Sequence, residues 1–180
     1  AAAMNVPALT VRRRPVIAFT ATGDELVMPG EPLGPTEIIS SNSLAMAAYV
    51  RALGGIPRDL GIARDNEDSL RETLAGAEGA EMLVTMGGAS VGDYDFVRKV
   101  LGDEGMDLGF YKVAMRPGKP LIFGRLGDVP VLGLPGNPVS AGGTSAIFLK
   151  AAMAVMLGLD DHGAAPATAL LGRDLEANDF

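Results

Sequence analysis

The sequence contains no cysteine and one histidine among its 180 residues. The lack of cysteine excludes thiolate metal sites, cysteine nucleophiles and disulfide bonds. It fits a cytoplasmic location, although it is compatible with any compartment. The single histidine, His162, lies in a segment that reads as a linker. General-base chemistry by histidine is therefore not expected.

Basic residues and long apolar runs are also scarce. Lysine and arginine together number 15 against 22 acidic residues, which gives a net charge of −7. Because a nucleic-acid surface needs concentrated cations, and Arg12–Arg14 is only a short run, no nucleic-acid partner is expected. The apolar stretch around 146–157 is interrupted by Lys150 and falls short of the roughly 20 residues needed to cross a bilayer. No membrane segment is therefore expected, and the N-terminus does not resemble a signal peptide.

Strand-like and helix-like segments alternate along the chain. Hydrophobic residues make up 48% of the sequence and charged residues 21%, as in an ordinary globular domain. Strands are predicted at 16–20, 56–63, 81–86, 108–115, 121–126 and 129–134, and helices at 41–53, 67–77, 93–101 and from Pro138 onward. This alternation predicts a mainly parallel sheet with helices on both faces, and ligands in such sheets bind at the carboxyl ends of the strands.

Changes in composition suggest three parts. Residues 1–14 are interpreted as a linker or the end of an upstream region, with Ala1–Ala3 as a remnant before Met4. The segment 15–158 is predicted to be the α/β domain. Residues 159–180 are interpreted as a linker followed by the truncated start of another unit. The chain thus resembles a domain cut from a longer protein.

The segment from Val129 to Ser140 is predicted to form a strand, a turn and the start of a helix. Pro135–Gly136 turns the chain, Asn137 suits the N-cap, and Pro138 suits the first helical position. The next N–H groups, at 139–141, are expected to be unpaired at the positive end of the helix dipole, where they would favour an oxyanion. A well-capped helix without a ligand is the alternative.

A second turn, Met86–Asp93, joins a buried strand to a helix. Gly87, Gly88 and Gly92 would let backbone N–H groups surround an oxyanion, and Ser90 could add a hydroxyl donor. The glycine spacing matches neither a Walker loop nor a dinucleotide fingerprint. A purely structural glycine-rich turn is the alternative.

Acidic residues follow several predicted strands. Because these strand ends meet at one edge of a parallel sheet, their carboxylates together suit Mg²⁺, which prefers oxygen ligands and is often shared with substrate phosphates. Taken singly, each acid is better explained as a helix cap or a first-turn residue. The residues concerned are Asp24, Glu25, Asp65, Asp93 and Asp95.

Cations that match these acids are expected in the segment 112–120. Lys112 precedes a tight turn at Pro117–Gly118, which would hold Arg116 and Lys119 near one another. A solvated basic turn is the alternative.

Five motifs in matching order resemble the molybdopterin molybdotransferase family, which contains the bacterial molybdenum-insertion enzyme and the C-terminal part of gephyrin. The resemblance covers about residues 12–175 and corresponds to the central molybdopterin-binding domain of the family. It implies a three-layer α/β/α sandwich, and it identifies 167–180 with the start of a C-terminal β-domain. The motifs are Thr22–Leu26, Asn42 within Ser40–Ser43, Gly87–Gly92 with Tyr94–Asp95, Arg116–Pro120 and Leu134–Ser140.

The resemblance implies an enzyme that inserts molybdate into adenylylated molybdopterin, with Mg²⁺-dependent release of AMP. It matches Glu25, Asp65 and Asp95 to catalytic and metal positions, and Lys112 and Arg116 to basic positions that handle molybdate or phosphate. Lysine is usual in some members where Arg116 stands, and glutamate also occurs at the position of Asp93. Substrate binding is assigned to Thr22, Gly23, Asp24, Asn42, Gly87, Gly88, Ser90, Gly92, Asp93, Lys119, Pro135, Gly136, Asn137, Pro138 and Ser140.

The resemblance also implies partners and leaves two alternatives. Members of the family work as dimers, so a homo-oligomer is expected, with the molybdopterin adenylyltransferase and molybdoenzymes as further partners. The first alternative is that related adenylyltransferase, although the segment Gly87–Ser90 lacks its Gly-Gly-Thr-Gly run. The second is a non-enzymatic scaffold with the same fold, which the acidic and basic residues of the rim argue against.

Overall fold

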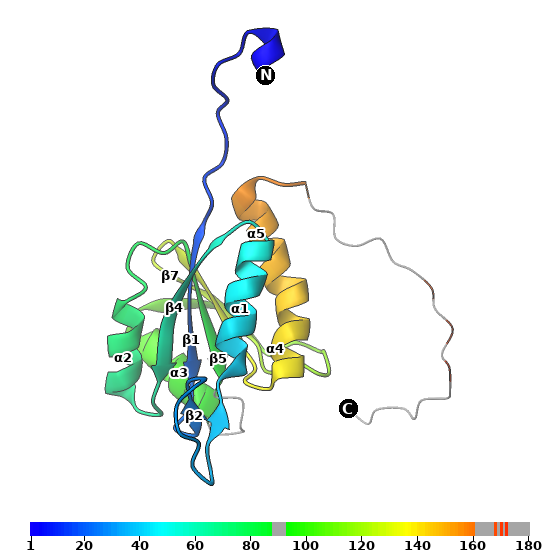
Figure 1. Ribbon diagram of the computed structural model, residues 1–180. Helices are drawn as coiled ribbons and strands as arrows, with labels where there is room; N and C mark the ends of the chain where they lie inside the picture. Colours follow the sequence, from blue (N-terminus) through cyan, green and yellow to red (C-terminus); the bar gives the residue numbers. More distant parts are fainter. Residues whose placement is uncertain (88–92, 161–167, 169, 171, 173–180) are drawn as a thin grey trace.

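The computed structural model describes residues 1–87 and 93–160, together with 168, 170 and 172. A sheet of six strands in the order β4-β1-β5-β8-β7-β6 forms its centre (Figure 1). Strands β4, β1, β5 and β8 are parallel neighbours, whereas β7 is antiparallel to both β8 and β6. The strands are β1 (Val16–Thr22), β4 (Ile56–Ala63), β5 (Met82–Gly87), β6 (Met106–Tyr111), β7 (Ile122–Leu126) and β8 (Val129–Leu134).

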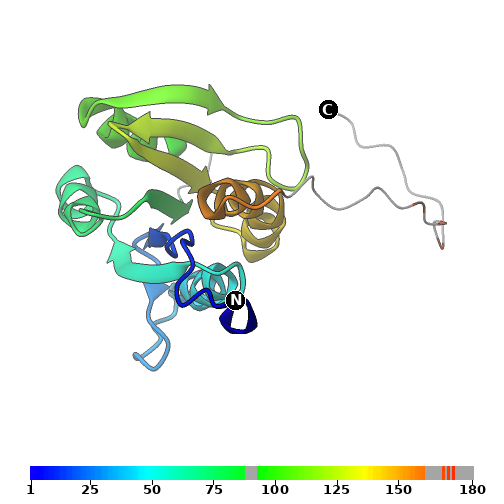
Figure 2. The ribbon, with the colours of Figure 1, turned by 90° about the horizontal axis from the view of Figure 1, so that it is seen from above.

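Helices cover both faces of this sheet (Figure 2). One face carries α1 (Ser41–Ala52) and a continuous helix made of α4 (Pro138–Thr144), the π-helix η2 (Ser145–Leu149) and α5 (Lys150–Leu157). The other face carries α2 (Glu67–Ala75) and α3 (Asp93–Asp103). This arrangement confirms the predicted three-layer α/β/α sandwich. A 3₁₀-helix, η1 (Ala2–Met4), and a two-stranded ribbon, β2 (Leu26–Val27) and β3 (Ile38–Ile39), complete the described elements.

Alternating side chains of the central strands build two separate cores. In β1, Ile17 and Phe19 pack with Met153 of α5, whereas Ala18 packs with Leu70 of α2 on the opposite face. Successive side chains of a strand point to opposite faces of a sheet, so a strand covered on both sides is apolar throughout. The continuous apolar runs in the sequence follow from this double burial.

The predicted elements are confirmed with small shifts at their ends. The strands expected at 56–63 and 129–134 have those bounds in the structure. The strand expected at 108–115 instead covers Met106–Tyr111, because Lys112 adopts a left-handed backbone with a φ of 68° that ends the extended conformation. The sequence did not indicate the ribbon of β2 and β3, whose strands contain only two residues each.

The continuous helix Pro138–Leu157 is longer and more apolar than the sequence indicated. By length and composition alone it could cross a membrane. However, Ala141, Leu149 and Met153 are buried, and the last two of these belong to the core between this helix and the sheet. One side of this helix therefore belongs to the core, whereas Ile147 and Val155 on it are exposed.

An exposed ion-pair network joins α2 and α3. Lys99 and Arg71 donate hydrogen bonds to the carboxylate of Glu67, and these bonds lower the pKa of that group. Because the folded pKa is lowered, the contribution of Glu67 to stability is present above its unfolded pKa and is lost as the pH falls. Exposed pairs of this kind contribute little, so the apolar cores carry the fold.

Three backbone segments approach closely at Gly87. This glycine has a φ of 128°, and a Cβ atom there would lie 2.4 Å from the carbonyl oxygen of Thr22 at the end of β1. A Cβ atom on Gly136, in the turn after β8, would in turn lie 3.0 Å from the Cα of Gly87. The carboxyl end of β5 is therefore held against its two neighbours without room for a side chain.

Asparagine side chains cap two helices. Asn66, rather than Asp65, caps α2 by accepting a hydrogen bond from the N–H of Ser69 at 2.8 Å. Asn137 caps α4 as predicted, and its Oδ1 accepts from the N–H groups of Val139 at 3.0 Å and Ser140 at 3.2 Å. At both helix starts, backbone N–H groups are thus hydrogen-bonded by side chains of the protein itself.

We predict that Gly87→Ala destabilises the domain much more than Gly79→Ala. Both glycines have positive φ angles, so each substitution strains the backbone by about 1–2 kcal/mol. Only at Gly87 does the new methyl group also clash with backbone, which adds about 1–3 kcal/mol, because no atom lies within 4 Å of a Cβ at Gly79. Urea denaturation measures both free energies of unfolding, and equal losses would contradict the close approach.

We also predict that Asn137→Ala and Asn66→Ala each lower the free energy of unfolding by about 1 kcal/mol, because each removes a helix cap. Urea denaturation of the two variants and of the parent chain gives the comparison. An unchanged stability for Asn137→Ala would mean that this side chain is not held by the helix start.

Candidate functional site

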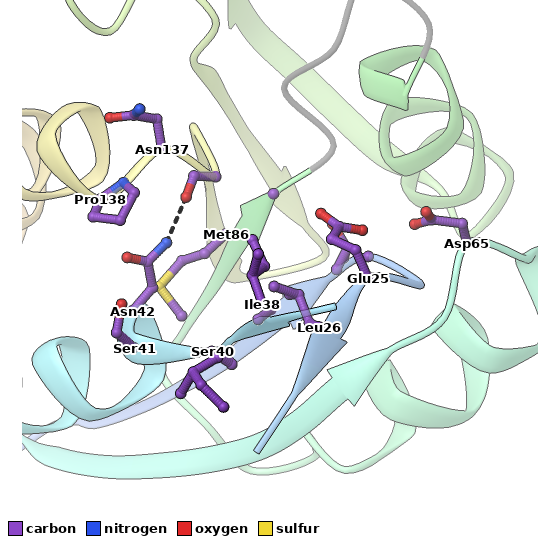
Figure 3. A pocket seen from close by; sticks show the side chains of 16 residues that line it. Glu25, Leu26, Ile38, Ser40, Ser41, Asn42, Asp65, Met86, Asn137 and Pro138 are labelled. Carbon is purple, nitrogen blue, oxygen red and sulfur yellow. Dashed lines mark hydrogen bonds between the residues drawn. The ribbon is translucent and has the colours of Figure 1, made fainter. Parts of the chain in front are cut away.

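A cavity of about 410 Å³ opens at the carboxyl edge of the central strands (Figure 3). Its walls come from the ends of β1 and β5, the β2–β3 ribbon, the start of α1 and the turn into α4. Ligands of open α/β sheets bind at this edge, and a cavity of this size can take a small organic molecule. The predicted site residues that line it are Thr22, Gly23, Glu25, Asn42, Asp65, Gly87, Gly136, Asn137 and Pro138.

Asp24 and Asp65 connect the loops that follow β1 and β4. The N–H of Asp65 donates to Oδ1 of Asp24 at 3.1 Å, and the N–H of Asp24 donates to Oδ2 of Asp65 at 3.3 Å. Asp65 lines the cavity, whereas Asp24 is not among the lining residues. Asp24 therefore holds the loop of Asp65 in place.

Arg64 reinforces this connection and was not found from the sequence. Its Nη1 donates to the carbonyl oxygens of Gly23 at 3.4 Å, Asp24 at 3.1 Å and Leu26 at 3.0 Å. One guanidinium thus holds three carbonyls of the loop that carries Glu25. No local sequence pattern distinguishes this arginine, because the carbonyls that its side chain binds lie about 40 residues away.

Glu25 is the second carboxylate of the cavity. Its backbone oxygen accepts a hydrogen bond from the N–H of Ile38 at 2.8 Å, so the ribbon of β2 and β3 fixes its position. Its carboxylate folds back over Gly23, where a Cβ atom would lie 2.5 Å from Oε2. Glycine at position 23 therefore makes room for the carboxylate.

Amide groups form the opposite side of the cavity. In Figure 3, Asn42, Asn137 and Pro138 lie across from Glu25 and Asp65. Nδ2 of Asn42 donates to the carbonyl oxygen of Gly136 at 2.6 Å and ties the start of α1 to the turn before α4. The cavity thus has an acidic side and a neutral, hydrogen-bonding side.

The expected oxyanion site at the start of α4 is wrong in one respect. The N–H groups of Val139 and Ser140 donate to Oδ1 of Asn137, and the N–H of Ala141 donates to its backbone oxygen at 2.8 Å. These three groups are paired within the helix start, because the cap residue uses both of its acceptors. Ser140 and Pro135 are not among the residues that line the cavity.

Thr22 brings a buried hydroxyl to the cavity. The residue is 3% exposed, and its Oγ1 has no hydrogen-bond partner among the residues that the structure describes. Burying an unpaired hydroxyl costs free energy, so such a group is a natural partner for a ligand.

The carboxylates suit a magnesium ion in part. Glu25 and Asp65 both line the cavity, and Mg²⁺ is often held by one or two carboxylates together with substrate phosphates. Among the side chains that the structure describes, no group of three or more acidic or histidine residues could hold a metal ion. The predicted third ligand, Asp95, begins α3 together with Asp93, and the side chains of both lie outside the described part of the structure. The same holds for the whole of Gly88, Ser90 and Gly92.

The basic segment lies at the same edge of the sheet but outside the lining of the cavity. Strand β6 is parallel to β8, since both are antiparallel to β7, so Lys112 follows a carboxyl end. However, β6 is the outermost strand, and Nζ of Lys112 lies 4.7 Å from the ring centroid of Tyr111. Arg116 and Lys119 are exposed and do not line the cavity either. These three cations therefore lie at the same sheet edge as the carboxylates, as expected, but they do not line the cavity with them.

Comparison with known proteins adds the family. Residues 18–154 match the family described as "Probable molybdopterin binding domain". The chain is 43% identical over 143 residues to a molybdopterin molybdenumtransferase of Nostoc, covering 77% of this chain and 33% of the relative. It is 38% identical over 181 residues to molybdopterin molybdenumtransferase 2 of Mycobacterium tuberculosis, covering 95% of this chain and 45% of the relative.

Solved structures agree with these relatives. The molybdopterin biosynthesis MoeA protein of Pyrococcus horikoshii matches with a TM-score of 0.74 and 31% identity, over 81% of this chain and 36% of that chain. Molybdenum cofactor biosynthesis protein B, at 10% identity and a TM-score of 0.58, shares the fold. The chain spans from a third to under half of the length of the curated relatives named above. By sequence and by fold, the chain belongs to the molybdopterin-binding domain family.

Proposed function

We propose that this chain is the central domain of a molybdopterin molybdotransferase, an enzyme that inserts molybdate into adenylylated molybdopterin and releases AMP. The observation that carries the proposal is the cavity at the carboxyl ends of β1 and β5, where two carboxylates face a hydrogen-bonding wall. The names of the relatives, molybdopterin molybdenumtransferases, support the choice of reaction.

Each side of the cavity would have its own task. Glu25 and Asp65 would hold Mg²⁺, which when bound offsets negative charge on the phosphates of the substrate. The hydroxyl of Thr22 would donate a hydrogen bond to a substrate oxygen, since Thr22 lines the cavity and has no described partner. The wall formed by Asn42 and Gly136 would fix the orientation of the substrate. Binding in a fixed geometry places the phosphoanhydride for attack by water, which yields AMP.

The basic segment would act from the outer edge of the sheet. Lys112, Arg116 and Lys119 supply positive charge near the same edge, which suits molybdate or a terminal phosphate. Because these side chains do not line the cavity, we assign them to the approach and holding of molybdate rather than to the phosphates inside it.

The remaining proposals concern the protein around this domain. We assign residues 15–158 to the molybdopterin-binding unit, 1–14 to an upstream connection and 159–180 to a linker with the start of a β-domain. The complete enzyme would be a cytoplasmic dimer whose sites are finished by other domains. It would receive its substrate from the adenylyltransferase and deliver its product to molybdoenzymes.

We predict molybdate-dependent release of AMP from molybdopterin-adenylate and Mg²⁺. The assay compares the chain alone with a chimera in which it replaces the matching segment of the Nostoc relative. The chimera should turn over, and the chain alone should be much slower, because positioning of reactants can supply roughly 7–11 kcal/mol of a barrier. Equal rates would contradict the need for flanking domains. Consumption of ATP with formation of the adenylate would instead favour the adenylyltransferase.

We predict that Glu25→Gln and Asp65→Asn each lower turnover of the chimera by about a hundredfold or more. Losing one catalytic charge interaction commonly costs about 3 kcal/mol of transition-state stabilisation. The amides keep the hydrogen-bonding oxygen, so the melting temperature should change by only a few degrees. Glu72→Gln on α2 is the matched control, because Glu72 does not line the cavity. Unfolding of both site variants without a separate loss of activity would mean that these acids serve the fold.

A further inference from the structure

A second cavity, of about 350 Å³, lies between α1 and the continuous helix of α4 and η2. Its floor is apolar, because Met46, Met86 and Ala141 are buried there, and the half-buried ring of Tyr49 forms part of its wall. Thioether and aromatic groups make favourable contacts with flat rings. The chemistry of this lining suits a planar, mainly apolar group.

The two cavities adjoin. Ser41, Asn42, Met86 and Pro138 line both of them. The amide of Asn42, hydrogen-bonded to the carbonyl of Gly136, stands at this boundary. One ligand could therefore place a charged part beside Glu25 and Asp65 and a ring between the helices.

A buried hydroxyl also lines the second cavity. Ser145 lines this cavity and is 3% exposed, and its Oγ has no hydrogen-bond partner in the described part of the chain. The neighbouring Thr144 pairs its hydroxyl within the helix, as serine and threonine commonly do: its Oγ1 donates to the carbonyl oxygen of Ser140 at 2.7 Å. Ser145 thus keeps a free hydroxyl at a cost in stability.

The helix changes its hydrogen bonding at the same residue. Ser145 begins the π-helix, and its carbonyl oxygen accepts from the N–H of Lys150, five residues on. Single π-helical turns inside α-helices occur frequently at functional sites. The unpaired hydroxyl, the π-helical turn and the adjoining cavities are separate observations that meet at one place.

We propose that the second cavity binds a flat heteroaromatic ring of the substrate, with Ser145 as the hydrogen-bonding group that recognises its polar edge. The inference rests on the proposed function, because molybdopterin-adenylate has two such rings, a pterin and an adenine, joined through a pyrophosphate. The pyrophosphate then lies in the first cavity beside the carboxylates, and one ring reaches between α1 and η2.

Gly142 and Gly143 allow a direct test with a matched control. A Cβ atom at either position meets no atom within 4 Å, so a side chain can begin at both positions without a clash. Only Gly142 lines the second cavity. Gly142→Leu therefore fills the cavity, whereas Gly143→Leu adds the same side chain to the same helix elsewhere.

The experiment titrates the chain with 6-hydroxymethylpterin, followed by its fluorescence, and with AMP, followed by calorimetry. We expect Gly142→Leu to abolish binding of one of the two probes, Ser145→Ala to weaken that probe about threefold to tenfold, and Gly143→Leu to bind as the parent chain does. The affected probe identifies the ring. Ser145→Ala should leave the melting temperature unchanged or raise it, which a structural role for the hydroxyl would not allow.

The proposal is overturned if neither probe binds the parent chain, or if both bind Gly142→Leu and Gly143→Leu equally well. These outcomes are separate from the fate of the proposed function, because ring binding is measured without turnover. If the chimera releases no AMP but Gly142→Leu still abolishes ring binding, only the proposed reaction is overturned. Normal AMP release by the chimera carrying Gly142→Leu overturns only the second cavity.

Discussion

The close approach of three backbones at Gly87 is the constraint on which the site depends. Only at this distance do the ends of β1 and β5 and the turn at Gly136 form one continuous wall. A side chain at Gly87 would occupy the space of the Thr22 carbonyl and hydroxyl. The absence of a side chain at Gly87 thus lets the ends of β1 and β5 and the turn before α4 meet beside the cavity.

The acidic side of the cavity is held by hydrogen bonds between loops that are distant in sequence. The backbone N–H groups of Asp24 and Asp65 each donate to the carboxylate of the other residue. Arg64 donates to the carbonyls of the loop that carries Glu25. Because Arg64 donates to backbone carbonyls, it fixes the backbone of the loop that carries Glu25. The placing of these acids thus depends on Arg64 and Asp24, which do not line the cavity themselves.

Charge and apolar surface are divided between separate places in this domain. The carboxylates lie in the first cavity, the cations lie on the segment after the edge strand β6, and the apolar cavity lies between α1 and η2. This separation suits a substrate that combines phosphates and flat rings, because each chemical part meets a lining of its own character.

The sequence alone determined the order of the elements, the three-layer sandwich and the cap at Asn137. Apolar runs and helical spacing indicate which residues are buried, and Asn137–Pro138 starts a helix through contacts with residues adjacent in the sequence. Contacts between distant segments could not be predicted in this way, because no local pattern encodes the partners of Arg64 or the space around Gly87. For the same reason, only the tertiary structure could place Lys112 outside the cavity and leave the hydroxyl of Ser145 without a partner among the described residues, because both depend on segments that are distant in the sequence.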